Sequence, residues 1–246
     1  MNNLIEEILR NRLVQQYGAE EIETLYRLAG AYFSEAGFPE EGIRYALLGK
    51  KEQLAVQIIE SNWDHLTDNG QNLRLLRWIN MMPSGVRNTD PTLLVIRAYL
   101  CDTIYFDYDA MGNLLESASR HLESRISNKR LMGAFAAVHS CFSFHTRELA
   151  QAMKFANQAL DTLEPDQALL QDYARHYKVM AASLMQVPSE VNSLIDSLEL
   201  NSGLTEDRHF MRWNVTKMFF YWHQANLKNL KQSGKIVTEI SKQEKD

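Results

Sequence analysis

The sequence predicts an all-α protein, built as an α-α superhelix of helical hairpins. Apolar residues recur at three- and four-residue spacing in one segment after another, and no alternating run of β-branched residues indicates a strand. Proline breaks helix interiors, so the scarce prolines should mark helix boundaries. They are Pro39, Pro83, Pro91, Pro165 and Pro188. The segments between them are therefore predicted to be amphipathic helices.

The first part of the chain is predicted to hold short helices separated by glycine and proline. Gly37 should end one helix, and Pro39 should open the next in its first turn. Asp90 is placed to cap the helix that begins at Pro91. The predicted helices before that point cover about 3–16, 20–36, 39–48, 51–61, 63–69 and 71–81, and a loop containing Pro83 and Gly85 follows them.

Longer helices are predicted after Pro91. They cover about 91–105, 108–126, 128–145, 147–163, 166–185, 188–199, 204–226 and 227–242. Asp107 and Asp109 stand at the turn before the second of these helices, where they are expected to cap it rather than to form a catalytic pair of carboxylates. Helices joined by such short turns pack antiparallel to their neighbours.

Small residues at fixed offsets indicate that these hairpins repeat. Ala152, Ala156 and Ala159 share one helix face, and Pro165 lies just beyond them, as in the second helix of a tetratricopeptide repeat. Weaker copies lie at 26–46 and around Ala98 and Ala110. The alternative is an ordinary bundle with alanine-rich helices. We therefore predict tetratricopeptide-like hairpins in a single helical-repeat domain spanning 1–246, with N-terminal hairpins in 1–62 and the remaining repeats in 63–246.

Composition excludes several classes of function. The chain has 246 residues, with 26 basic and 31 acidic side chains and a formal net charge of -5, so this segment alone should not attract nucleic acid. No apolar run reaches the roughly 20 residues that span a bilayer, and the N-terminus is not a signal peptide. Two cysteines within apolar patterns, Cys101 and Cys141, are expected to be reduced, which predicts a cytoplasmic protein without membrane contact.

A resemblance to a known family rests on several motifs. They are Leu25–Gly37 followed by Glu40–Leu47, then Trp78-Ile79 shortly before Met82-Pro83, and then the helix start at Pro91. These stretches resemble the helical region of the large ATP-binding transcriptional regulators of the LuxR type, the MalT-like group. Gly42 stands where that family usually has alanine, and Tyr45 where it often has histidine; either should be tolerated at a helix crossing.

The resemblance implies a sensor function for the helical array. In that family the array binds an inducer or a regulatory protein and couples it to an ATPase module and a DNA-binding module. This chain contains neither a Gly-x4-Gly-Lys-Ser/Thr phosphate loop nor a helix-turn-helix. It is therefore expected to be part of a larger regulator or a shortened relative, without catalysis or cofactor and with possible self-association. The alternative is a free-standing tetratricopeptide-like adaptor that binds a protein or peptide.

Aromatic residues with a few hydrogen-bond donors are expected to line a concave groove for a small-molecule inducer or a peptide. The alternative is that they are ordinary core and surface residues. The candidate ligand-binding residues are His139, Phe142, Tyr173, His176, Tyr177, Arg212 and Trp213.

A dense aromatic run lies on the late helix predicted at 204–226. Such a helix, apolar over more than one face, is either an inner helix covered on both sides or a docking surface for a further repeat or a partner. The candidate partner-docking residues are Phe219, Tyr221 and Trp222.

Metal binding and nucleophilic catalysis are not expected. His139, Cys141 and His145 are metal-ligand types, with Cys101 as a conceivable fourth, but the six-residue spacing of the histidines places them on different helix faces. Cys141 could act as a nucleophile, yet no oxyanion loop or family signature accompanies it.

Overall fold

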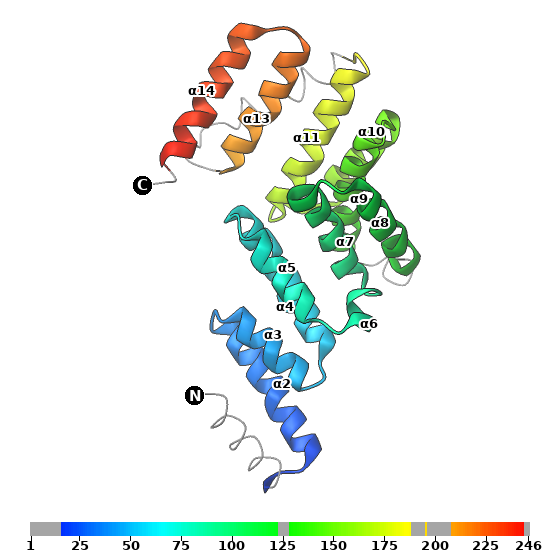
Figure 1. Ribbon diagram of the computed structural model, residues 1–246, viewed down its shortest axis with the longest axis vertical. Coiled ribbons are helices and arrows are strands. Elements are labelled where there is room, and N and C mark those ends of the chain that lie inside the picture. The colour runs from blue at the N-terminus through cyan, green and yellow to red at the C-terminus, as the bar shows by residue number, and fades with distance from the viewer. Residues whose placement is uncertain (1–15, 123–127, 188–194, 196–207, 244–246) are drawn as a thin grey trace. The chain divides into compact units, whose positions relative to one another are not determined.

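The computed structural model describes residues 16–122, 128–187, 195 and 208–243, and Figure 1 shows the order of its helices. Throughout these ranges the regular structure is helical and contains no strand, which confirms the predicted all-α fold. The chain divides into two compact units, Met1–Ile96 and Arg97–Asp246. This boundary lies well beyond residue 62, where the sequence analysis subdivided the array. The superhelix itself stays a prediction.

The first unit is a succession of helices in which each packs on the next. α2 packs on α3, α3 on α4, and α4 on α5, while α3 also meets α5, as expected for stacked hairpins. The helices are α2 (Ala19–Glu35), α3 (Pro39–Leu48), α4 (Glu52–Asp68), α5 (Asn72–Met81) and the short α6 (Ser84–Arg87). The helix predicted at 3–16 lies outside the described residues.

Most helix boundaries follow the predicted chemistry. Gly37 has a φ of 84° just after α2, in the left-handed region that favours glycine, and Pro39 is the first residue of α3. Asp90 accepts hydrogen bonds from the backbone N–H groups of Thr92 and Leu93, at 3.0 and 3.3 Å. These backbone N–H groups lie in the first turn of α7 (Pro91–Leu100), where they have no carbonyl partner within the helix, so Asp90 acts as the cap.

The prediction of two helices at 51–61 and 63–69 is wrong, because α4 is continuous from Glu52 to Asp68. No glycine or proline interrupts this stretch. Ser61 and Asn62 direct their side chains to the carbonyl oxygen of Ile58, at 3.1 and 2.8 Å. Polar side chains that bond back to the preceding turn are compatible with an unbroken helix.

Glycine allows α2 and α3 to cross closely. A Cβ on Gly42 would lie 3.0 Å from the carbonyl oxygen of Gly30, and a Cβ on Gly30 would lie 3.0 Å from the backbone nitrogen of Ala46. Because these neighbours are backbone atoms, they cannot move aside as a flexible side chain can. Glycine at residue 42, a departure from the family pattern, therefore suits this close crossing.

Trp78, part of the family-like motif, anchors α5 to α3. Its side chain is fully buried, and its indole Nε1 donates to Glu40 at 3.2 Å. Arg77 pairs with the same carboxylate at 2.6 Å. The motif thus has a packing role in this unit, because it connects one hairpin to the next.

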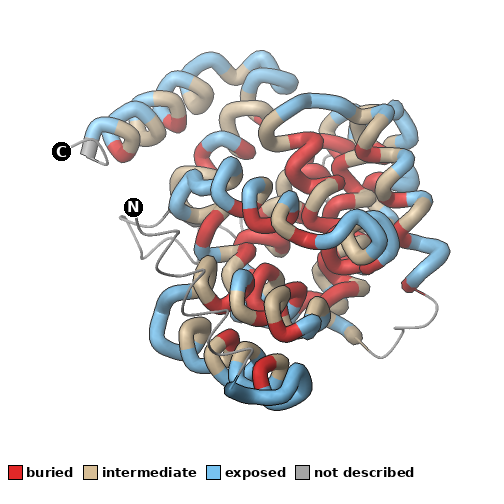
Figure 2. The backbone as a smooth tube through the Cα atoms, turned by 60° about the horizontal axis from the view of Figure 1, so that its bottom comes forward, coloured by how far each residue is buried: buried red, intermediate tan, exposed pale blue. Residues whose placement is uncertain are grey.

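The second unit begins near the end of α7 and continues through a π-helical turn, η1 (Cys101–Tyr105). α9 and α10 form a hairpin, α11 packs on both, and α13 packs on α11 and α14. Figure 2 shows buried residues on the helix sides that face neighbours. The remaining helices are α8 (Tyr108–Leu122), α9 (Lys129–His145), α10 (Leu149–Thr162), α11 (Ala168–Leu184), α13 (Arg208–His223) and α14 (Leu227–Gln243).

Two further predictions are met in this unit. Ala152, Ala156 and Ala159 are fully buried in α10, as the repeat pattern requires. Asp107 accepts a hydrogen bond from the backbone N–H of Ala110 at 2.9 Å and so caps α8. The helix predicted at 188–199 lies outside the described residues, except for Ile195. No described helix is both long enough and apolar enough to cross a bilayer.

The helix predicted at 91–105 differs from the observed structure over its last five residues. These residues form η1, and Phe106, which directly follows η1, has a φ of 53°, in the left-handed region. A π turn is wider than an α turn by one residue, so it changes where the following side chains project. Asp102 lies within this turn and is buried.

Because α2 and α3 cross closely, we expect a larger side chain at residue 42 to destabilise the fold. Gly42→Ala should lower the free energy of unfolding by about 1–2 kcal/mol, because overpacking against backbone exceeds the gain in helix propensity. Gly85→Ala is the matched control, since a Cβ at that exposed position meets nothing within 4 Å. Urea denaturation followed by circular dichroism measures both, and equal stability of the two variants would contradict the crossing argument.

Candidate functional site

A buried carboxylate lies at the centre of the second unit. Asp102 is 8% exposed, and tyrosine hydroxyl groups from two helices donate to it. Tyr173 and Tyr177 of α11 donate to Oδ2 at 2.7 and 3.3 Å, and Tyr108 of α8 donates to Oδ1 at 3.2 Å. Burying a carboxylate is costly unless hydrogen bonds replace its water. These three hydroxyl groups provide that replacement.

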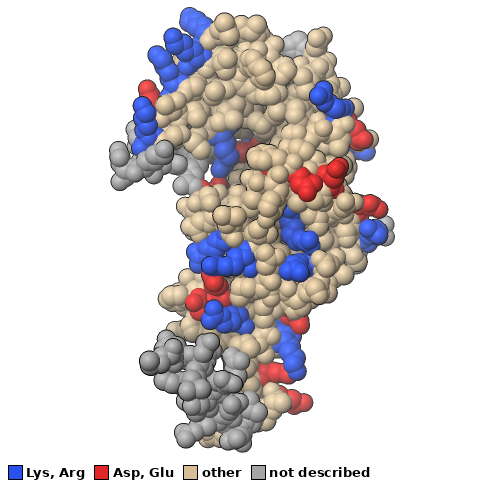
Figure 3. Space-filling view, viewed as in Figure 1, with Lys and Arg blue, Asp and Glu red and all other residues tan. Residues whose placement is uncertain are grey.

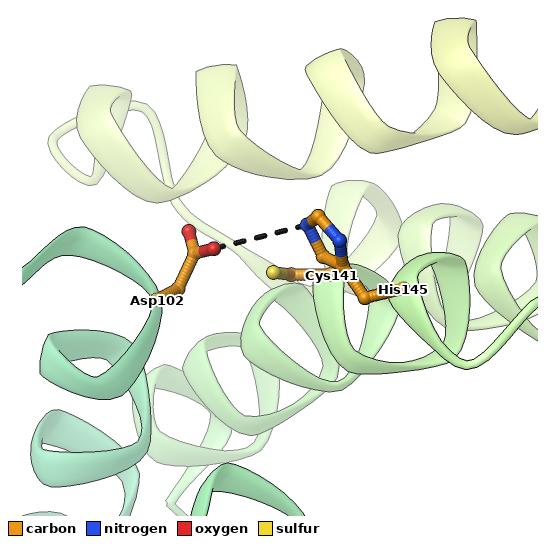
Figure 4. Close-up of side chains that lie close together, drawn as sticks. All are labelled: Asp102, Cys141 and His145. Atoms are coloured by element: carbon orange, nitrogen blue, oxygen red, sulfur yellow. Dashed lines mark ion pairs between the residues drawn. The ribbon is translucent and has the colours of Figure 1, made fainter. Parts of the chain in front are cut away.

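α9 brings a thiol and an imidazole to the same carboxylate. Cys141 and His145 are four residues apart on α9 and therefore project from one face. Figure 4 shows them directed towards Asp102, with 3.8 Å between His145 Nε2 and Asp102 Oδ1. The His145 ring stacks on Tyr108 at a centroid distance of 3.9 Å. We refer to Asp102, Tyr108, Cys141, His145, Tyr173 and Tyr177 as the Asp102 cluster.

Burial sets the protonation states in the Asp102 cluster. It raises the pKa of the Cys141 thiol well above its usual value. It also lowers the pKa of His145, although the negative charge of Asp102 opposes that shift. A nucleophilic cysteine needs a lowered pKa, and here the shift has the opposite sign. The thiol and the imidazole are therefore both neutral near pH 7, which does not suit a thiolate–imidazolium pair.

A cavity of about 270 Å³ lies beside the Asp102 cluster, between α7, η1, α11 and α13. Aromatic side chains form much of its wall, and Tyr173 and Tyr177 belong both to this wall and to the cluster. We call it the α11–α13 pocket. Its aromatic and positively charged lining residues include Tyr99, Tyr173, His176, Tyr177, Arg212 and Trp213.

A charged pair is fixed at the wall of the α11–α13 pocket. Asp172 is 4% exposed and accepts from Arg212 Nε at 3.0 Å, joining α11 to α13. Arg175 also reaches Asp172, at 3.4 Å, and its guanidinium lies 5.9 Å from the ring centre of Trp213. The pairing holds the Arg212 guanidinium in place at the pocket wall.

The histidine of the pocket has a defined tautomer. His176 Nδ1 lies 2.8 Å from Thr216 Oγ1, and that hydroxyl donates its single proton to the carbonyl oxygen of Arg212 at 3.1 Å. The hydrogen-bond network therefore assigns the ring proton to Nδ1, which leaves Nε2 as an acceptor. Burial lowers the pKa of His176 to about 4, so the ring is neutral near pH 7.

The structure brings together five of the seven candidate ligand-binding residues. Tyr173, His176, Tyr177, Arg212 and Trp213 all line the α11–α13 pocket. That these residues bind a ligand stays a prediction.

The other two candidates, His139 and Phe142, line a separate groove between α8 and α9. The His139 ring stacks on Phe155 at 4.0 Å, and its Nδ1 lies 3.3 Å from Ser143 Oγ. Burial lowers the pKa of His139. These contacts fit the alternative interpretation of His139 as a packed histidine.

Three residues on which these sites depend were not among those predicted from the sequence: Asp102, Asp172 and Thr216. Each lies on the buried side of an element. An acidic residue within an apolar run, such as Asp102 after Tyr99-Leu100-Cys101, was the available signal. Its partners could not be read from the sequence, because Tyr173 follows Asp102 by 71 positions.

The aromatic run of α13 is divided between core and surface. Trp213 and Phe220 are buried, Phe219 and Tyr221 are half-buried, and Trp222 is 64% exposed. α13 packs between α11 and α14, which supports the inner-helix interpretation for most of the run. Of the three candidate docking residues, Trp222 presents the largest exposed fraction.

The neighbouring helix α14 carries exposed lysines, and Figure 3 shows basic side chains along it.

No protein-family model, curated protein or solved structure matches the chain. The Asp102 cluster and the α11–α13 pocket are therefore the features from which a function can be inferred.

Because His176 is buried, we expect the stability of the folded chain to depend on pH. Its pKa is about 4 in the folded chain and 6.5 when exposed, so the unfolded chain binds this proton more readily between those values. The stabilisation is complete above pH 6.5 and should be lost as the pH falls towards 4, by on the order of 3 kcal/mol.

His176→Gln should remove that part of the slope, as measured by urea unfolding at a series of pH values. His121→Gln, at an exposed position of the same unit, is the control and should retain the slope of the unmodified chain. Identical pH profiles for the two variants would contradict the assignment.

Proposed function

We propose that this chain is the sensor domain of a MalT-like, LuxR-type transcriptional regulator and that it binds a small-molecule inducer in the α11–α13 pocket. The main evidence for this proposal is the pocket itself. It combines an aromatic wall with a fixed guanidinium and a neutral imidazole, a combination of apolar surface and few placed polar groups that is typical of ligand sites.

The chemistry of the pocket favours a small, neutral, hydroxyl-bearing ligand. A volume of about 270 Å³ is at the small end for ligand pockets, which suits a sugar-sized molecule. Arg212 shares the carboxylate of Asp172 with Arg175, which partly balances the charge of Arg212 and fixes its guanidinium at the pocket wall. Tyr99, Tyr173 and Trp213 provide ring faces on which the apolar side of a sugar can stack.

The position of the pocket suits signal transmission. Its walls come from α7, η1, α11 and α13, so a bound ligand would contact several elements of the second unit at once. A ligand that binds one packing arrangement better than another shifts the population towards it. In the proposed function this shift passes to ATPase and DNA-binding modules that lie outside this chain, in the cytoplasm.

A second candidate is an adaptor that binds a protein or peptide, without a small-molecule inducer. The observation that favours it is an exposed apolar stripe on α2. Leu25, Leu28 and Tyr32 share one helix face and are 45%, 52% and 67% exposed. Neither candidate assigns a nucleophilic role to Cys141, because burial raises the pKa of its thiol.

A thermal-shift screen of the chain against sugars, amino acids and peptides tests the proposed function. A sugar at about 100 times its Kd should raise the free energy of unfolding by about 2.7 kcal/mol. Val215 lines the pocket and is 44% exposed, so Val215→Trp should fill the opening without disturbing the core and weaken binding at least tenfold. Val215→Ala, which keeps the cavity open, is the matched control.

Two outcomes would contradict the sensor proposal. One is a ligand whose thermal shift is the same in Val215→Trp as in the unmodified chain, because that ligand would bind elsewhere. The other is a response to peptides alone that is lost in Leu28→Ser of the α2 stripe, which would favour the adaptor.

A further inference from the structure

We propose that Asp102, Cys141 and His145 form a zinc-binding site. The carboxylate, thiol and imidazole donor atoms all lie within 4.8 Å of one another, and His145 Nε2 lies 3.8 Å from Asp102 Oδ1. In a tetrahedral zinc site with ordinary bond lengths, such donors lie roughly 3.3–3.6 Å apart. The donor atoms must therefore move closer by up to about 1.5 Å to bind one ion.

Rigid elements hold the three ligands. Cys141 and His145 project from one face of α9, and Asp102 is fixed in the π turn η1 that faces them (Figure 4). Cys141 is fully buried, whereas the His145 side chain is 27% exposed. An ion could therefore enter past His145 and be enclosed on the Cys141 side.

The donor set selects among metals. A thiolate, an imidazole and a carboxylate together suit Zn²⁺, whereas Mg²⁺ and Ca²⁺ prefer oxygen ligands alone. On binding, the ion replaces the proton of the Cys141 thiol, which leaves to solvent. With three ligands from the chain, the fourth position would be available to water or a bound molecule.

The tyrosines of the Asp102 cluster are suited to orient the ligands. Tyr173 and Tyr177 donate to Oδ2 of Asp102, whereas Oδ1 accepts from Tyr108 at 3.2 Å and also faces His145 at 3.8 Å. Tyr108 stacks on His145 and fixes its ring plane. Such outer partners hold metal ligands in place and raise affinity.

The test uses the whole chain, freed of metal by a chelator and then titrated with Zn²⁺ and, separately, with Co²⁺. We expect one ion per chain by elemental analysis, a rise in Tm with Zn²⁺, and a sulfur-to-cobalt charge-transfer band with Co²⁺. Asp102→Asn and Cys141→Ser should each weaken Zn²⁺ binding at least tenfold, and Cys141→Ser should abolish the band. Cys101→Ser removes the other buried thiol and is the matched control. This variant should retain both the Zn²⁺ affinity and the cobalt charge-transfer band of the unmodified chain.

Failure to bind one ion per chain, or a cobalt spectrum without a thiolate band, would overturn the proposal and leave the Asp102 cluster a hydrogen-bonded core. Loss of the band in Cys101→Ser but not in Cys141→Ser would also overturn it. The cobalt spectra of the unmodified chain and of Cys101→Ser decide the matter even if Cys141→Ser does not fold. Because ligand screening can be done in chelator, this result is independent of the outcome for the α11–α13 pocket.

Discussion

The hydrogen bond from the Tyr173 hydroxyl to the buried carboxylate of Asp102 is the interaction on which the second unit depends. It measures 2.7 Å and joins the π turn after α7 to α11, across 71 residues of sequence. A buried carboxylate without partners would destabilise the fold strongly. Through Asp102, η1 is also connected to Tyr108 at the start of α8 and to His145 at the end of α9. One side chain thus sets the relative positions of elements that form both candidate sites.

Local chemistry made much of the fold predictable. The start of α7 follows from Asp90 and Pro91, and the capping role of Asp107 follows from its place before α8. Three features were beyond such reasoning. The continuous α4 reflects the weak helix-breaking effect of Asn62, the π turn has no sequence signature, and the partners of Asp102 come from distant helices. The aromatic pattern of the sequence nevertheless identified most of the residues that line the pocket. They lie on α11 and α13 and face a common space: Tyr173, His176, Arg212 and Trp213.

The pocket and the Asp102 cluster share two side chains, which has consequences for function. Tyr173 and Tyr177 line the pocket with their rings while their hydroxyl groups bind Asp102. Any event that moves Asp102 would move the pocket wall, and a ligand against these rings would in turn affect the cluster. Reciprocal coupling of this kind is what a sensor requires. This coupling also distinguishes the proposed sensor from the proposed adaptor, because the exposed α2 stripe of the adaptor belongs to the first unit.

A double-mutant cycle between Asp102 and Tyr173 tests the central claim most directly. The free energy of unfolding would be measured in chelator for the unmodified chain, Asp102→Ala, Tyr173→Phe and the double variant. If the carboxylate and the hydroxyl form the bond that organises this unit, the coupling energy should be at least about 1 kcal/mol. Additive effects of the two substitutions would show that the bond does not organise the unit, and both candidate sites would lose their common foundation.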